Sequence, residues 1–187
     1  CRGALPSTLS GWTPAPEAGE SFLLRQAGAD AVGVQSMEPL LSALGHTAIV
    51  VLFAALLRES RVIVTSSSVQ QMAAVVHGLA RLLYPFKWQH IFIPVLPHHL
   101  LDYAQAPMPF LIGVHSSFFG ELAKMELDDV VIVDVDTGRV ASRTAVAEFM
   151  PSRASARLLS TVKSVQGSFM RRGVLGEARL LRAFERF

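Results

Sequence analysis

The sequence predicts an α/β fold with three layers, in which a mostly parallel sheet carries helices on both faces. Short apolar runs alternate with segments of helical periodicity, as in sheets whose parallel strands are joined by helices. The runs are apolar at successive positions, which is typical of strands buried on both faces. Of the 187 residues, 51% are hydrophobic and only 17% are charged, a composition that supplies a sizeable core and argues against disorder.

Composition divides the chain into three predicted segments. Residues 1–38 are rich in Gly, Pro, Ala and Ser and are predicted to be a linker with little regular structure. Residues 39–150 carry the alternating pattern of the α/β lobe, and residues 151–187 show two helical segments. The chain opens on Cys1, so we expect a fragment or a processed product. Cys1 is also the only cysteine, which excludes an internal disulfide and favours a reducing, intracellular setting.

The first half of the lobe is predicted to be a helix, a strand and a second helix. The first helical pattern runs from Met37 to Glu59, and its apolar stretch Ala48–Leu57 is about half the length that crosses a bilayer. The β-branched run Arg61–Thr65 suits a buried strand. Ser66–Ser68 follow it and can cap the next helix. The apolar stripe of that helix is Val69, Met72, Ala73, Val76, Ala80 and Leu83.

The second half of the lobe is predicted to add three strands and two short helical segments. Pro85 ends the preceding helix, because a residue before proline avoids the helical region. The strands are Ile91–Ile93, Phe110–Val114 and Val130–Val133. The first helical segment is a short turn over His98–Tyr103. The second is a helix that runs to about Met125, with Ser116 or Ser117 as its cap. A turn at Asp136–Gly138 follows the last strand.

Charge is distributed unevenly along the chain. Residues 1–138 carry 7 Lys/Arg against 12 Asp/Glu (net −5), residues 139–187 carry 10 against 3 (net +7), and the whole chain has a net charge of +2. The basic segment could contact acidic lipid headgroups, nucleic acid or an acidic partner, or its arginines could form the solvated face of amphipathic helices. It shows no recognised nucleic-acid motif, so we expect no nucleic-acid partner.

The sharpest enzymatic pattern is VVIVDVDTG at Val130–Gly138. An apolar strand that ends in Asp-x-Asp resembles the magnesium site of haloacid-dehalogenase-type phosphotransferases, with Asp134 as nucleophile and Asp136 as acid/base. The usual threonine of that family falls two residues after the second Asp, where this chain has Gly138. The structural alternative is a strand end followed by a turn.

Other catalytic patterns fail on spacing. Ser66–Ser68 lie after a strand, where helix N-termini bind phosphate, but they lack the glycine and lysine of a P-loop, so capping is favoured. No G-x-S-x-G elbow presents a serine. The six histidines show no H-E-x-x-H spacing, and the adjacent pair His98–His99 has no third ligand nearby. We therefore expect no metal site and no cofactor.

The order of these motifs resembles the central part of a DENN domain, and most of all the connecdenn subfamily. The motifs are RVIVTSSS, LLYPFKWQHIFIPVLP, HHLLDYAQAPMPFLIGVH, SSFFGEL and LDDVVIVDVDTG. The likeness runs from about Leu40 to Gly138 and is most specific from Leu82 to Asp129. It implies a Rossmann-like central lobe. The run PAPEAG at Pro14–Gly19 resembles the linker that leaves the N-terminal longin-like lobe, which would be missing. Leu158–Phe187 resembles the opening helices of a truncated C-terminal section.

The resemblance also implies a function. DENN proteins promote guanine-nucleotide exchange on Rab GTPases in membrane trafficking and endocytosis, which makes them regulatory exchange factors rather than enzymes with a chemical step of their own. Such a factor works by differential binding of nucleotide-bound and nucleotide-free states. We therefore expect a Rab-family partner and a cytoplasmic protein peripheral to endosomal or vesicle membranes, with membrane contact possible through the basic C-terminal segment.

The candidate partner contacts are polar groups near predicted strand ends. They are Ser66, Ser67, Ser68, His98, His99, Asp128 and Asp129. Two other functions stay open from the sequence: a haloacid-dehalogenase-like phosphohydrolase that uses Asp134 and Asp136, and a module that binds a GTPase without exchange activity.

Overall fold

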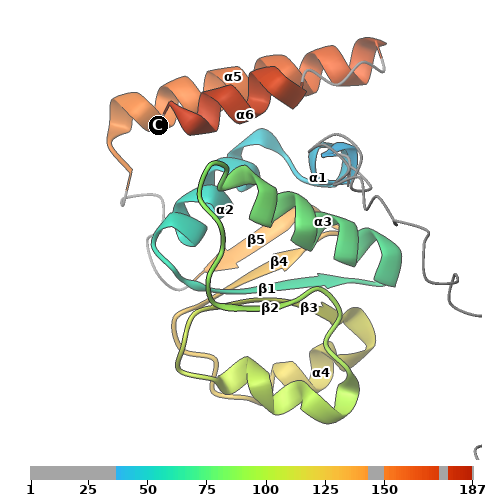
Figure 1. Cartoon of the computed structure of the whole chain (residues 1–187). Helices are drawn as coiled ribbons and strands as arrows, with labels where there is room; N and C mark the ends of the chain where they lie inside the picture. Colours follow the sequence, from blue (N-terminus) through green and yellow to red (C-terminus); the bar gives the residue numbers. More distant parts are fainter. Residues whose placement is uncertain (1–36, 143–149, 173–176, 187) are drawn as a thin grey trace, which may run out of the picture. The chain divides into compact units, whose positions relative to one another are not determined.

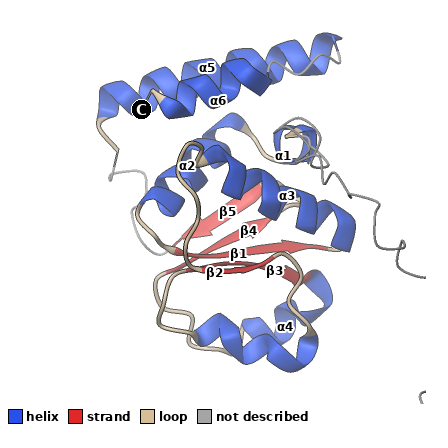
Figure 2. Ribbon diagram, in the orientation of Figure 1, coloured by secondary structure: helices blue, strands red, loops and turns tan. Residues whose placement is uncertain are grey.

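A five-stranded sheet lies at the centre of the part of the chain that the structure describes (Figures 1 and 2). The computed structural model describes residues 37–142, 150–172 and 177–186, so the predicted linker at 1–38 lies almost wholly outside the described residues. The strand order is β2-β3-β1-β4-β5. The strands are β1 (Arg61–Ser66), β2 (Ile91–Ile93), β3 (Phe110–His115), β4 (Val130–Asp134) and β5 (Arg139–Ser142).

The first four strands are parallel, which confirms the predicted mostly parallel α/β sheet. β1 and β3 are buried along almost their whole length because both faces of the sheet are covered. The sequence prediction missed β5, which pairs antiparallel with β4 through the turn at Gly138. Its four residues are mostly exposed at the edge of the sheet, so they lack the apolar run that marks the other strands.

Helices α1 (Glu38–Ala43), α2 (His46–Leu57) and α3 (Val69–Leu82) cover one face of the sheet, here called the helical face. The single helix predicted from Met37 to Glu59 is two helices, because Gly45 is extended (ψ 155°) and caps the start of α2. The buried stripe of α3 includes the predicted Met72 and Val76 and extends to Leu79 and Leu82. Val69, predicted to be in that stripe, is 47% exposed.

Helices α5 (Ser152–Arg172) and α6 (Glu177–Glu185) form a further layer outside the helical face (Figure 1). Phe184 of α6 packs edge-on against Phe53 of α2, with ring centroids 4.5 Å apart. The Gln166 amide of α5 donates to the Leu41 and Leu44 carbonyls at 2.7 and 2.9 Å. These contacts join the two predicted C-terminal helices to the lobe, and Gln35–Phe187 form one compact unit.

Short helical segments cover the opposite face, here called the turn face. They are the 3-10 helices η1 (His98–Gln105) and η2 (Ser116–Phe118) and the helix α4 (Phe119–Leu122). The predicted helix that runs to Met125 is therefore shorter, and its cap is the His115 side chain rather than a serine. The core of this face gathers Ile63, Leu101, Phe110 and Ile112. Within the described residues, no helix has both the length and the hydrophobicity to cross a bilayer.

Candidate functional site

The carboxyl ends of β1, β3 and β4 meet at one edge of the sheet. The chain leaves β1 into α3 on the helical face and leaves β3 into η2 and α4 on the turn face. Neighbouring parallel strands whose connections diverge in this way open a crevice where α/β proteins bind ligands. The polar groups there are called the carboxyl-edge cluster and comprise Ser66, Ser67, His115, Ser117, Asp134, Asp136 and Thr137.

Asp136 joins the β4–β5 turn to the end of β1. The Ser66 hydroxyl donates to its Oδ1 at 2.7 Å, and the Ser67 backbone N–H donates to its Oδ2 at 2.7 Å. The Ser66 hydrogen bond, followed by that of the Ser67 amide, lowers the pKa of Asp136. The carboxylate is therefore held in its ionised form as an acceptor between two loops.

His115 spans the crevice between β3 and β1. Its Nδ1 accepts from the Ser117 backbone N–H at 3.2 Å and lies 2.7 Å from the Ser117 hydroxyl. Its Nε2 lies 3.0 Å from the Ser67 carbonyl oxygen, which can only accept, so Nε2 carries the proton in the neutral ring. A serine–histidine pair is thus present, but a backbone carbonyl, rather than a carboxylate, orients the imidazole. The contacts cap η2 and tie the end of β3 to the loop after β1.

Asp134 organises the turn that follows β4. Its Oδ1 accepts from the backbone N–H groups of Asp136 (3.0 Å) and Thr137 (3.4 Å), and its Oδ2 accepts from the Thr137 hydroxyl at 2.7 Å. Both oxygens that a phosphohydrolase would direct at phosphate and magnesium are used by the turn. The part of the chain that the structure describes also holds no group of three or more His, Cys, Asp or Glu placed to bind a metal ion. The geometry matches the structural interpretation of this motif.

The seven predicted partner contacts fall in three separate places. Ser66, Ser67 and Ser68 lie at the carboxyl edge, where Ser66 is fully buried, Ser67 is exposed and Ser68 caps α3 by accepting from the Gln71 N–H at 3.3 Å. His98 and His99 are exposed at the start of η1. The His98 Nε2 forms an ion-pair contact with Glu121 of α4 at 3.0 Å. The structure therefore does not gather the seven residues into one surface.

Asp128 and Asp129 lie at the opposite, amino edge of the sheet. The guanidinium of Arg61 donates to the Asp128 carbonyl there, and Asp129 and Glu59 both adopt a left-handed backbone (φ 59° and 55°). A pocket of about 290 Å³ is lined by residues that include Arg58, Glu59 and Asp129.

The sequence prediction missed two residues of the carboxyl edge. His115 and Asp136 were not considered as partner contacts, yet both belong to the carboxyl-edge cluster. The rule that carboxyl ends of parallel strands meet at one edge would have placed them there.

The fold and this edge define a Rossmann-like α/β lobe whose carboxyl edge is polar and hydrogen-bonded. The chain belongs to the DENN (AEX-3) domain family, whose model matches residues 13–138. It is 47% identical over 112 residues to DENN domain-containing protein 1B of Mus musculus, covering 60% of this chain and 15% of that protein. It is 43% identical over 114 residues to DENN domain-containing protein 1A of Homo sapiens, covering 61% and 11%.

A third relative extends the same set of proteins. DENN domain-containing protein 1C of Mus musculus is 47% identical over 103 residues, which cover 55% of this chain and 13% of that protein. The 1A, 1B and 1C proteins are the connecdenn group, so the predicted resemblance to connecdenns is confirmed. The chain spans only 11% to 15% of the length of these three relatives.

Proposed function

We propose that this chain is part of a guanine-nucleotide exchange factor that binds a Rab-family GTPase and promotes GDP release in membrane trafficking. The observation that carries the proposal is the DENN domain match over residues 13–138, together with the identity to the 1A, 1B and 1C proteins. Exchange requires no nucleophile of the factor's own, since the factor acts by binding the nucleotide-free GTPase more tightly. Its place of action would be the cytoplasmic side of endosomal or vesicle membranes.

We place the GTPase contact at the carboxyl edge, on Ser67 and its neighbours among the predicted contacts. Three loops are tied together there by the bonds of Asp136 to Ser66 and Ser67 and of His115 to Ser67. A surface whose polar groups are already paired loses little conformational entropy on binding, which favours a preorganised docking site. Ser67 and Asp136 are both exposed, so a partner can reach them.

Release of labelled GDP from a panel of Rab GTPases, with the full-length parent protein, tests this proposal. We expect acceleration for at least one Rab. Ser67→Arg places a bulky cation on the proposed contact and should slow that exchange about tenfold, which corresponds to a loss of about 1.4 kcal/mol of binding. The matched control Gln105→Arg adds the same charge at an exposed position of η1 and should leave the rate unchanged.

Each other outcome has a definite meaning. Acceleration of no Rab would overturn the exchange activity and leave a module that only binds a GTPase. Equal slowing by Ser67→Arg and Gln105→Arg would overturn the carboxyl edge as the contact while leaving exchange intact. A magnesium-dependent phosphatase activity that Asp134→Asn abolishes would replace the whole proposal by the phosphohydrolase hypothesis.

A further inference from the structure

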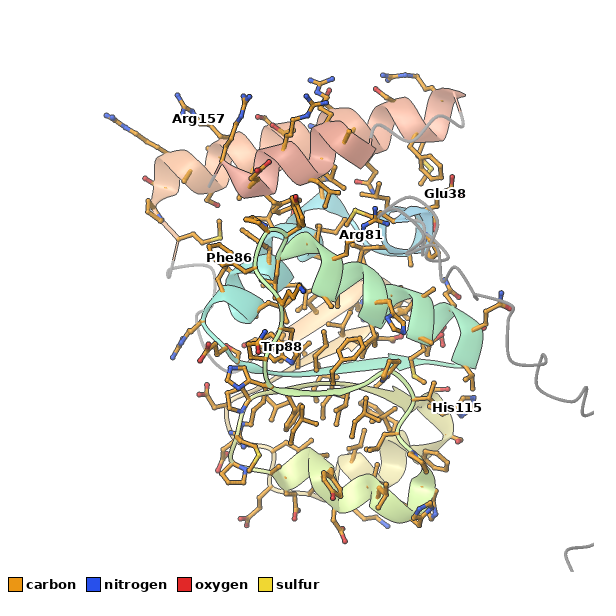
Figure 3. All side chains as sticks on the ribbon, viewed as in Figure 1. Glu38, Arg81, Phe86, Trp88, His115 and Arg157 are labelled. Atoms are coloured by element: carbon orange, nitrogen blue, oxygen red, sulfur yellow. The ribbon has the colours of Figure 1, made fainter. Side chains whose placement is uncertain are left out.

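A basic groove lies between α5 and α6, apart from the carboxyl edge. It has a volume of about 1210 Å³ and is lined by the start of α5 and by α6. Five exposed arginines line it and define what is here called the arginine groove: Arg153, Arg157, Arg179, Arg182 and Arg186. Arg157 points outward from the α5–α6 layer in Figure 3, away from the sheet. The groove is therefore open to a partner from outside.

The helical spacing of the arginines places them in two rows. Arg153 and Arg157 are four residues apart on α5, so they share one helix face. Arg179 and Arg182 are three residues apart on α6, and Arg186 follows four residues after Arg182, just beyond the helix end. Both rows line the same groove. A ligand that fits between them is elongated along the helices and carries negative charge on both of its sides.

The positive charge of the groove is not neutralised within the described part of the chain. No Asp or Glu lines the groove, and none of the five arginines forms an ion pair with a described carboxylate. The Arg182 Nε donates to the Ala178 carbonyl at 3.0 Å, within the same helix and not to a carboxylate. Ordinary solvated helix faces mix both signs, because clustered like charges repel one another. A single-sign cluster of this kind therefore favours an anionic partner.

The other lining residues distinguish between anionic partners. Ala154, Ala156 and Ala183 are small and leave the groove hollow, which suits a chain segment lying between the helices. Helices that bind membranes bury large apolar side chains in the lipid interface. None of the exposed large hydrophobic residues of the described chain lines this groove. It also contains no aromatic side chain on which a nucleic-acid base could stack.

We propose that the arginine groove binds an acidic peptide segment of a protein partner. The planar guanidinium presents paired N–H donors that match a carboxylate in a bidentate manner, which lysine cannot do. All five cations of the groove are arginines, so aspartate and glutamate side chains of an extended or helical segment are well matched. This inference stands apart from nucleotide exchange, because the groove lies on the α5–α6 layer rather than at the carboxyl edge.

Binding of a fluorescein-labelled glutamate–alanine repeat peptide to the full chain tests the inference by fluorescence anisotropy. We expect saturable binding that weakens as the salt concentration rises, and no binding of the glutamine–alanine peptide of equal length. The double variant Arg157→Gln/Arg182→Gln removes one cation from each row and should weaken binding of the acidic peptide about tenfold or more. Both side chains are exposed, so the far-UV circular dichroism and the thermal midpoint should stay unchanged.

The matched control is Lys163→Gln/Arg171→Gln, which removes the same charge from exposed positions of α5 outside the groove. It should retain binding within about twofold, since only distant screened charges change. If the two double variants lost the same amount of peptide affinity, binding would depend on the net charge of the chain, and the arginine groove would be overturned as the binding site. Absence of acidic-peptide binding would also overturn it. Binding to vesicles of phosphatidylcholine with phosphatidylserine, without binding to the peptide, would assign the groove to a membrane surface instead.

Discussion

The two faces of the sheet share the same strands but are covered to different depths. Along β1, Val62 and Val64 lie in the core shared with α1, α2 and α3, and α1 and α2 in turn pack against α5. Ile63 points to the other side, where η1, η2 and α4 form one thin layer. A cavity of about 410 Å³, lined in part by Phe119 and Leu122, opens beside α4. The helical face is thus buried under two layers of helices, whereas the turn face is buried under one thin layer.

This difference determines how each face responds to a change in volume. A residue between two packed layers has neighbours on every side, so neither an added nor a removed group is easily accommodated. A short helical segment with solvent behind it can move by a few tenths of an ångström. We therefore expect matched substitutions to cost more stability on the helical face than on the turn face.

The largest difference between the two faces is expected for a pair of glycine substitutions, of which Gly113→Ala lies at the centre of β3. A Cβ there would lie 2.1 Å from the Pro94 carbonyl oxygen and 3.0 Å from Met72 Cγ of α3, so it faces the helical side. Glycine in a strand often marks such a close approach of another backbone. Because backbone must move, we expect a loss of about 3 kcal/mol or more in the free energy of unfolding, measured by urea denaturation.

Gly120→Ala on α4 is the matched control for the turn face. A Cβ at this position meets no atom within 4 Å, so the substitution has space. Replacing a helical glycine by alanine should then stabilise the protein by up to about 1 kcal/mol. If Gly113→Ala unfolds at the same urea concentration as the parent chain, the close approach of Pro94 does not constrain the strand.

A smaller difference is expected between two buried leucines. Leu79 of α3 is 0% exposed in the core of the helical face, and Leu101 of η1 is 4% exposed on the turn face. Leucine-to-alanine changes in cores cost about 2–5 kcal/mol, depending on how far the surroundings collapse into the cavity. We expect about 4 kcal/mol for Leu79→Ala and about 2 kcal/mol for Leu101→Ala, from paired denaturation curves. Equal costs would show that the thin layer is as rigid as the double one.

The sequence predicted the parts of both faces that depend on apolar runs. The four parallel strands, α3, η1 and the two C-terminal helices follow from local patterns, since each buries a continuous stripe or run. β5 was missed because an exposed edge strand such as Arg139–Ser142 needs no apolar run. The break at Gly45 was missed because the residues on both sides have helical patterns.

The candidate site was harder to predict, because it depends on contacts between distant segments. Ser66 and Asp136 are 70 residues apart and meet only because β1 and β4 pair in the observed register, Arg61 with Val130. His98 and Asp129 are also near strand ends, but at other places on the sheet, and local sequence does not distinguish them. The cap at His115 shows the same limit, since an imidazole took the role expected of Ser116 or Ser117.

The smallest effect is expected for Asp136→Asn, at the edge where the two faces meet. The folded pKa of Asp136 is lowered by its bonds from Ser66 and Ser67. The ionised carboxylate therefore adds stability above the pKa of an unfolded aspartate, about 3.9, and this contribution disappears as the pH falls through the lower folded pKa. Asparagine cannot accept both bonds, because only its carbonyl oxygen is an acceptor and its amide nitrogen can only donate.

Thermal midpoints of the parent chain and of Asp136→Asn, measured from about pH 7 to about pH 2, test this difference. The parent should be slightly more stable at neutral pH, and the two midpoints should converge in acid. The difference should be smaller than for either leucine variant, because the carboxylate is exposed and solvent screens it. Ser66→Ala should reduce the same pH-dependent part, since the Ser66 hydroxyl is the main cause of the lowered pKa of Asp136. Parallel profiles for the parent and Asp136→Asn would mean that the hydrogen bonds of this edge position its loops without adding to the stability of either face.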